Sequence, residues 1–141
     1  MSRFSMFMKE NKIGRENERY AATKGLCDEN GGPLEWEFRH ISSKENDSIR
    51  QSCTVEEIGN GGAYRTKLKA GQYISKLIAA SVVYPDLYDA ELQDSYGVKT
   101  PEELLYAMVD DPGEYNSLAA FIQKFQGFDT TFEERVEQAK N

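Results

Sequence analysis

The sequence predicts an α+β fold that is mainly α-helical, with an N-terminal β-hairpin followed by about five helices. Three observations support this prediction. Residues 34–40 alternate strictly between apolar and polar side chains, which is the period of a half-buried strand. After residue 69, apolar side chains recur at spacings of three and four, which is the period of a helix that faces a core. Capping and breaking residues separate these helical segments from one another.

The chain begins with a short apolar pattern. Phe4, Phe7 and Met8 have the spacing of one helix face, so one or two amphipathic helical turns are expected over residues 4–10. A strongly charged stretch over residues 9–19 follows.

The alternating run has an extended segment before it. Residues 20–26 and 34–41 flank residues 28–33, whose sequence Asp-Glu-Asn-Gly-Gly-Pro is rich in turn formers. Two extended runs joined by such a turn predict a β-hairpin. Trp36 and Phe38 lie on the same face of its second strand and are expected to face the core.

A capping motif predicts the first long helix. Ser42 and Glu45 have the spacing of a capping box, and a polar helix is expected to reach about Cys53, with Ile49 buried. The glycine-rich residues 59–62 then break the chain. We interpret them as a flexible loop and not as a phosphate cradle, because neither a GK[ST] motif nor a preceding apolar strand accompanies them.

The strongest helical pattern covers residues 69–84, and Pro85 is expected to stop the helix. Its core-facing stripe comprises Ala70, Tyr73, Ile74, Leu77, Ile78, Ser81 and Val82. Asp86 is then expected to cap a short helix that Gly97 ends.

Two further helices are expected before the C-terminal tail. Thr100 and Pro101 suit the start of a helix whose core side is Leu104, Leu105 and Met108. After a break at residues 110–113, the last helix carries the stripe Tyr115, Leu118, Ala119, Ile122 and Phe125, and Gly127 closes it. We therefore expect one globular domain over residues 1–128. Residues 129–141 have only a thin apolar stripe and are expected to form a tail with some helical character.

Charge is distributed unevenly along the chain. The formal net charge is −7. Residues 86–114 hold nine acids and one base and so carry −8, while the remaining residues sum to +1. A strongly negative region repels phosphate backbones and argues against a nucleic-acid partner. Two interpretations of the acidic face stay open, namely a merely solvated surface and a docking site.

The sequence carries no targeting signal that would place it outside the cytoplasm. The N-terminal residues lack the apolar core of a signal peptide, and the longest apolar-rich run, residues 77–84, is too short to span a bilayer. Cys27 and Cys53 lack a CxxC spacing and are expected to be free thiols. We therefore expect a cytoplasmic protein without a membrane partner.

Residue types that carry catalysis or bind metals are scarce or unsuitably spaced. His40 lies on the inward face of a predicted strand, which favours a structural role, although a Cys–His pair formed in space stays open. The acids at 86, 89, 91 and 94 have helical spacing and lack the central glycine of a calcium loop. The sequence thus predicts no catalytic residue, no cofactor and no metal, and favours a protein that acts by binding another protein.

Tyrosines punctuate the acidic region, at Tyr84, Tyr88, Tyr96, Tyr106 and Tyr115. Tyrosine suits protein interfaces because its ring buries area while its hydroxyl stays hydrated, but the same residues could complete a small core. Both interpretations stay open. The candidate protein-binding residues belong to a tyrosine-lined region and to the C-terminal stripe: Tyr84, Leu87, Tyr88, Leu92, Tyr96, Phe128, Phe132 and Val136.

Several short motifs belong to one pattern: residues 7–11 (FMKEN), 33–39 (PLEWEFR), 77–87 (LIAASVVYPDL), 90–98 (AELQDSYGV), 112–115 (PGEY) and 126–128 (QGF). Over roughly residues 4–129 the chain resembles the XkdN-like tail-assembly chaperones of long-tailed phages and prophages. The central motifs at 77–98 are the more specific part of this resemblance.

The resemblance implies a chaperone that binds the tape measure protein, a very long helical protein that sets tail length. Such a chaperone keeps its client soluble in the host cytoplasm, helps to recruit the tail tube protein and is absent from the mature virion. A second copy of the chain is a further candidate partner. The alternative is a structural virion protein, such as a tail-completion or connector subunit, which would share the size and the lack of catalytic residues.

Overall fold

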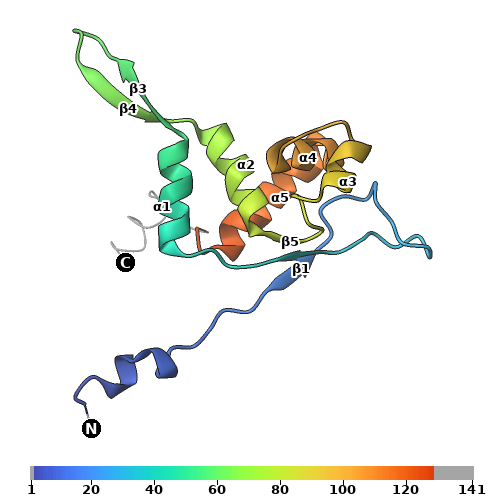
Figure 1. Cartoon of the computed structure of the whole chain (residues 1–141), viewed down its shortest axis with the longest axis horizontal. Helices are drawn as coiled ribbons and strands as arrows, with labels where there is room; N and C mark the ends of the chain where they lie inside the picture. The colour runs from blue at the N-terminus through green and yellow to red at the C-terminus, as the bar shows by residue number, and fades with distance from the viewer. Residues whose placement is uncertain (1, 129–141) are drawn as a thin grey trace, which may run out of the picture.

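The computed structural model describes residues 2–128, which form five α-helices and two small antiparallel sheets (Figure 1). The helices are α1 (Ser43–Ser52), α2 (Ala70–Ser81), α3 (Ala90–Ser95), α4 (Pro101–Met108) and α5 (Pro112–Phe125). One sheet has the strand order β1-β2-β5, formed by Glu18–Tyr20, Trp36–Phe38 and Val82–Tyr84. The other pairs β3 with β4, formed by Thr54–Ile58 and Tyr64–Leu68. The predicted α+β class, with an N-terminal strand pair before five helices, is confirmed.

Strand β2 lies at the centre of the three-stranded sheet. It pairs antiparallel with β1, so that Glu18 faces Phe38 and Tyr20 faces Trp36. The side chains of Trp36 and Phe38 are fully buried, as the alternating pattern predicted. The period-two pattern therefore identified both the strand and its buried face correctly.

The first strand of this pair lies earlier in the chain than predicted. It ends at Tyr20, and residues 21–26 do not continue it. The reason is a competing set of hydrogen bonds, because the Thr23 hydroxyl and the Lys24 N–H each donate to the Glu114 carboxylate at 2.7 Å. This segment is thereby attached to the start of α5, and the hairpin has a long connection over residues 21–35.

Strand β5 replaces the last turn of a predicted helix. The expectation that the helix would continue to Tyr84 is wrong, since α2 ends at Ser81 and Val82 pairs with Phe38 of β2. The backbone N–H of Arg39 also donates to the Ser81 carbonyl at 2.8 Å. Two consecutive β-branched valines favour extended backbone, and the open edge of β2 supplies their hydrogen-bond partners.

The structure contains a second hairpin where a flexible glycine loop was predicted. Strands β3 and β4 pair in register from Thr54–Leu68 to Ile58–Tyr64. Gly61 and Gly62 have φ angles of +86° and +81°, a conformation that favours glycine. The hairpin projects from the helical body (Figure 1). A hairpin turn between paired strands therefore takes the place of the flexible loop that was expected at residues 59–62.

The predicted helix boundaries are largely confirmed. Ser42 and Glu45 form the capping box of α1, and Thr100 caps α4 through the Glu103 N–H. Two details differ. The cap of α3 is Asp89 and not Asp86, and the predicted break at residues 110–113 contains Asp111, which caps α5.

The N-terminal residues form two short 3-10 turns, Ser5–Phe7 and Lys9–Asn11, instead of an amphipathic α-helix. None of the residues in these turns is buried. Figure 1 shows this N-terminal arm, residues 2–15, leading away from the helices and the sheet. We use the name N-terminal arm for these residues below.

The core lies where α2, α4 and α5 meet the inner face of the three-stranded sheet. Its fully buried large side chains include Trp36, Phe38, Leu77, Ile78, Leu87, Leu104, Leu105, Leu118 and Ile122. The predicted core residues Ile74 and Phe125 pack against this cluster and are half-buried. Within residues 2–128, no helix is both long and apolar enough to cross a bilayer.

Candidate protein-binding surfaces

His40 and the two cysteines occupy separate environments. The imidazole of His40 stacks on Phe125 with ring centroids 3.9 Å apart, and its buried Nδ1 has no hydrogen-bond partner within residues 2–128. The exposed Cys27 thiol donates to the Lys24 carbonyl, while Cys53 is buried beside the Ser52 hydroxyl. The described residues contain no group of three side chains that could hold a metal ion.

Three of the five predicted tyrosines are exposed, and we call them together the tyrosine surface: Tyr84, Tyr88 and Tyr96. They lie on β5, on the turn after it and at the end of α3. Tyr88 is the most exposed of them, at 74%. Leu92 of α3 is half-buried and packs against the core. The structure thus exposes three of the predicted binding residues over β5, the turn after it and α3.

Leu87 does not belong to this surface. Its side chain is 2% exposed and lies in the core, so its predicted place among the protein-binding residues is wrong. The turn between β5 and α3 causes the difference. The Tyr88 N–H donates to the Asp86 carboxylate at 3.0 Å, and the Gln93 amide donates to the Leu87 carbonyl at 2.8 Å. These bonds fix a turn in which Leu87 is buried and Tyr88 is exposed.

Tyr88 borders a shallow pocket of about 360 Å³ between α1, α2 and β5. Ile49 and Val82 contribute apolar wall, and an Arg39–Glu45 ion pair closes one side. Arg39 binds both oxygens of Glu45, at 3.1 and 2.6 Å. The hydrogen bonds from Arg39 lower the pKa of the Glu45 carboxyl, and those same bonds raise the pKa of Arg39. The pocket therefore joins an apolar wall to a fixed ion pair.

Tyr106 and Tyr115 form a separate pair between α4 and α5. Their rings stack with centroids 5.0 Å apart, and the Tyr115 hydroxyl donates to that of Tyr106 at 3.4 Å. Burial raises the pKa of Tyr115 above its usual range. The half-buried ring of Tyr115 packs against the core. For this residue, the interpretation that the tyrosines complete a small core holds.

A further group of exposed large apolar side chains lies in the N-terminal arm, which was not among the predicted binding residues. Its members are Phe4, Met6, Phe7, Met8 and Ile13. Phe7 and Ile13 are 85% and 89% exposed, values that leave both side chains almost fully in water. The signal was present as five large apolar residues within ten positions. Three of them, Phe4, Phe7 and Met8, were interpreted as one face of one or two amphipathic helical turns.

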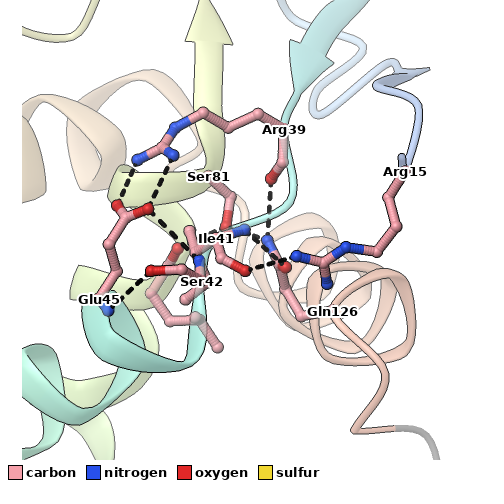
Figure 2. A network of polar contacts seen from close by, with 8 residues as sticks. Arg15, Arg39, Ile41, Ser42, Glu45, Ser81 and Gln126 are labelled. Carbon is pink, nitrogen blue, oxygen red and sulfur yellow. Dashed lines mark hydrogen bonds and ion pairs between the residues drawn. The ribbon is translucent and has the colours of Figure 1, made fainter. Parts of the chain in front are cut away.

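The base of the arm is attached to the body through a polar network (Figure 2). Arg15 donates to the Ile41 carbonyl at 3.0 Å. The Gln126 side chain accepts from the Ile41 N–H at 3.1 Å and donates to the Arg39 carbonyl and the Ser81 hydroxyl at 3.0 and 2.8 Å. These bonds join the arm, β2, α2 and the end of α5 at one point.

A second pocket, of about 620 Å³, lies between the start of β1 and α5. Half-buried aromatic rings form its apolar wall, and its lining residues are Glu16, Asn17, Glu18, His40, Phe121, Lys124 and Phe125. Phe121 also stacks on Tyr20 with centroids 4.3 Å apart. This pocket was not predicted, because Phe125 was assigned to the core-facing stripe of its helix.

The predicted C-terminal stripe is represented in the structure by Phe128, which is exposed. Phe132 and Val136, the other members of that stripe, lie outside the described residues.

Comparisons with known proteins find similarity over almost the whole chain. A family model described as phage XkdN-like tail assembly chaperone protein matches residues 4–140. The uncharacterized protein YqbN of Bacillus subtilis (strain 168) is 24% identical over 137 residues, which cover 97% of this chain and 92% of that protein. The phage-like element PBSX protein XkdN of Bacillus subtilis (strain 168) is 23% identical over 137 residues, covering 97% and 93%.

A solved structure shares the fold. The crystal structure of the protein YqbN superposes with a TM-score of 0.75 at 20% sequence identity, and the match covers 92% of this chain and 99% of that one.

Proposed function

Since the chain belongs to the phage XkdN-like tail assembly chaperone family, we propose that it binds the tape measure protein and keeps that client soluble during tail assembly. In this proposal the protein acts in the host cytoplasm, helps to recruit the tail tube protein and is absent from the mature virion. It acts by binding and catalyses no reaction. The observation that carries the proposal is the family match over residues 4–140, which includes every candidate binding surface.

The exposed apolar side chains support a role in binding. A chaperone for a long helical client needs exposed apolar surface that is not buried in its own core. The tyrosine surface provides such area next to the pocket lined by Ile49 and Val82. Its surrounding acids, on residues 86–114, keep the free protein hydrated and disfavour unspecific contacts.

Co-expression with the tape measure protein, followed by a pull-down, tests the proposal. We expect Tyr88→Ala to weaken client capture about tenfold, because aromatic side chains carry much of the energy of an interface. Tyr64→Ala is the matched control, since Tyr64 is 73% exposed but lies on the β3–β4 hairpin away from the tyrosine surface. Failure of the parent chain to capture the client would refute the proposal. Equal losses in both variants would refute the assignment to the tyrosine surface.

The same assay tests the C-terminal tail. We propose that residues 1–128 fold as one domain and that residues 129–141, with Phe132 and Val136, contribute to client binding. A chain that ends at residue 128 should keep its melting temperature and capture less client. An unchanged pull-down would exclude the tail from binding, and a large fall in melting temperature would show that the tail is part of the folded core. Analysis of purified virions separates a chaperone from a tail-completion or connector subunit, because the subunit would be present in them.

A further inference from the structure

From the exposed arm and its charge we infer that the N-terminal arm of one copy docks on the tyrosine surface of a second copy. This inference goes beyond client binding and is tested on the purified chain alone. The starting point is the arm itself. Its five large apolar side chains are exposed, and a group of this kind on an isolated chain indicates an interaction surface.

The positive charge of the arm indicates which surface it binds. Residues 2–15 contain Arg3, Lys9, Lys12 and Arg15 but a single acid, Glu10. Residues 86–114, which include two residues of the tyrosine surface, carry −8. Within residues 2–128 the ion pairs are Arg19–Glu37, Arg39–Glu45 and Arg65–Glu57, so neither the bases of the arm nor these acids are neutralised inside the described part of the chain. Two uncompensated surfaces of opposite sign attract each other.

The side-chain chemistry of the two surfaces also fits. The arm offers Phe4, Phe7 and two methionines, and the partner surface offers Tyr84, Tyr88 and Tyr96. Aromatic rings pack favourably against other rings and against the sulfur of methionine, and lysine or arginine lies favourably over a tyrosine face. The contact would therefore bury apolar area at its centre and leave acid–base pairs at its rim.

The position of the arm makes this contact intermolecular. Arg15 and Asn17 fix its base, through the Ile41 carbonyl at 3.0 Å and the Glu37 carboxylate at 2.9 Å. From there the arm leads away from the body, while α3 lies on the opposite side of the molecule (Figure 1). An arm that leads away from its own body and docks on a second copy gives an intermolecular contact, which produces rings or open chains of copies when it is not reciprocal.

Charge exchange tests the inference by sedimentation velocity. The parent chain should form species larger than a monomer as its concentration rises, and about 0.5 M salt should reduce them because it screens exposed charges. Lys9→Glu/Lys12→Glu in the arm should weaken the association about tenfold or more, and so should Glu91→Lys/Asp94→Lys on α3. None of these four side chains forms a hydrogen bond or an ion pair within residues 2–128.

The decisive variant carries all four substitutions. It keeps the parent net charge of −7, and it should recover the association because the two signs are exchanged across the contact. Lys44→Glu/Lys67→Glu changes the net charge as much as the arm variant does, on exposed residues of α1 and β4, and should leave the association intact. Circular dichroism serves as the control that every variant is folded.

Three results would overturn the inference. They are a parent chain that stays monomeric at low salt, a fourfold variant that does not recover, and an association that survives both charge reversals. Binding of duplex DNA that depends on Lys9 and Lys12 would likewise overturn it and assign the arm to a polyanion. Since no tape measure protein is present in these experiments, their failure is distinct from a failure of client binding.

Discussion

Gln126 shows how much one side chain contributes to this small fold. Its amide contacts three backbone or side-chain groups from two other elements, the Ile41 N–H, the Arg39 carbonyl and the Ser81 hydroxyl (Figure 2). Ser81 in turn is fully buried and donates to the Leu77 carbonyl at 2.7 Å. A glutamine is suited to this place because its amide both donates and accepts, so one residue satisfies donors and acceptors at the end of β2.

Replacing Gln126 should therefore cost more than one surface hydrogen bond. We expect Gln126→Ala to lower the free energy of unfolding by about 2–3 kcal/mol, because it leaves partly buried backbone groups without partners. Chemical denaturation measures this loss. Gln123→Ala is the control on the same helix, since Gln123 makes one bond to the Ala119 carbonyl of its own helix, and it should cost less than about 1 kcal/mol. Equal losses would contradict the role given to Gln126.

At the scale of single elements, Glu45 both takes part in the capping box of α1 and attaches this helix to the sheet. Glu45 accepts the Ser42 N–H within the capping box and pairs with Arg39, which follows β2. The two roles use the same carboxylate. The ionised Glu45 carboxylate therefore contributes to holding α1 against the sheet.

This dependence predicts a pH effect of known sign. Arg39 lowers the pKa of Glu45 in the folded chain, so the ion pair stabilises the fold above the pKa of an unfolded glutamate and this contribution is lost as the pH falls through the lowered value. Glu45→Gln keeps a residue that suits the capping box but removes the charge. The difference in unfolding free energy between parent and variant should be largest at pH 7 and shrink below about pH 4.

Denaturation curves at several pH values measure this difference. In an Arg39→Gln background the pH dependence of the Glu45→Gln effect should largely disappear, because the cause of the pKa shift is gone. If it persisted there, Arg39 would not be that cause.

Sequence patterns identified those elements whose determinants are local. The alternation around Trp36 and Phe38, the capping box of Ser42 and the Thr100–Pro101 helix start were read correctly, since each depends on residues a few positions apart. Strand β5 was missed because Val82 continues a helical stripe in sequence, while the hydrogen-bond partners of the strand come from the distant edge of β2.

The second hairpin and the exposure of the binding residues could not be predicted from local sequence patterns. Most side chains of β3 and β4 are exposed, so these strands have no apolar alternation to detect. Leu87 was placed on the surface because its burial depends on the Asp86 turn and on Gln93. The arm was missed because its apolar spacing is the same whether a core covers it or water does.

At the scale of the whole molecule, a small core carries several unburied appendages. The buried cluster joins α2, α4 and α5 to the sheet, while the arm and the β3–β4 hairpin add almost nothing to it. The stability of the fold therefore depends on the core and hardly on these two appendages. Changes in the appendages should leave the melting temperature unaffected, whereas changes in the core should unfold the protein.

Cavity-forming substitutions test this division. Leu77→Ala and Ile122→Ala should each cost about 2–5 kcal/mol, because both side chains are fully buried and the vacated space adds to the lost transfer energy. Ile58→Ala on the hairpin should cost less than about 0.5 kcal/mol, since Ile58 is exposed. Equilibrium unfolding in urea measures all three. Costs below about 1 kcal/mol at both core sites would mean that the wrong helix faces were assigned to the interior.

The late position of Gln126 and Phe121 in the chain has a consequence for synthesis. The ribosome makes β1, β2 and α2 first. The ring of Phe121 that contacts Tyr20 and Phe38, and the Gln126 amide that joins Arg39 to Ser81, are added later. Until α5 has emerged, the nascent chain presents Trp36 and Phe38 without their cover. The core of this protein can therefore close only once α5 is available to pack on the sheet.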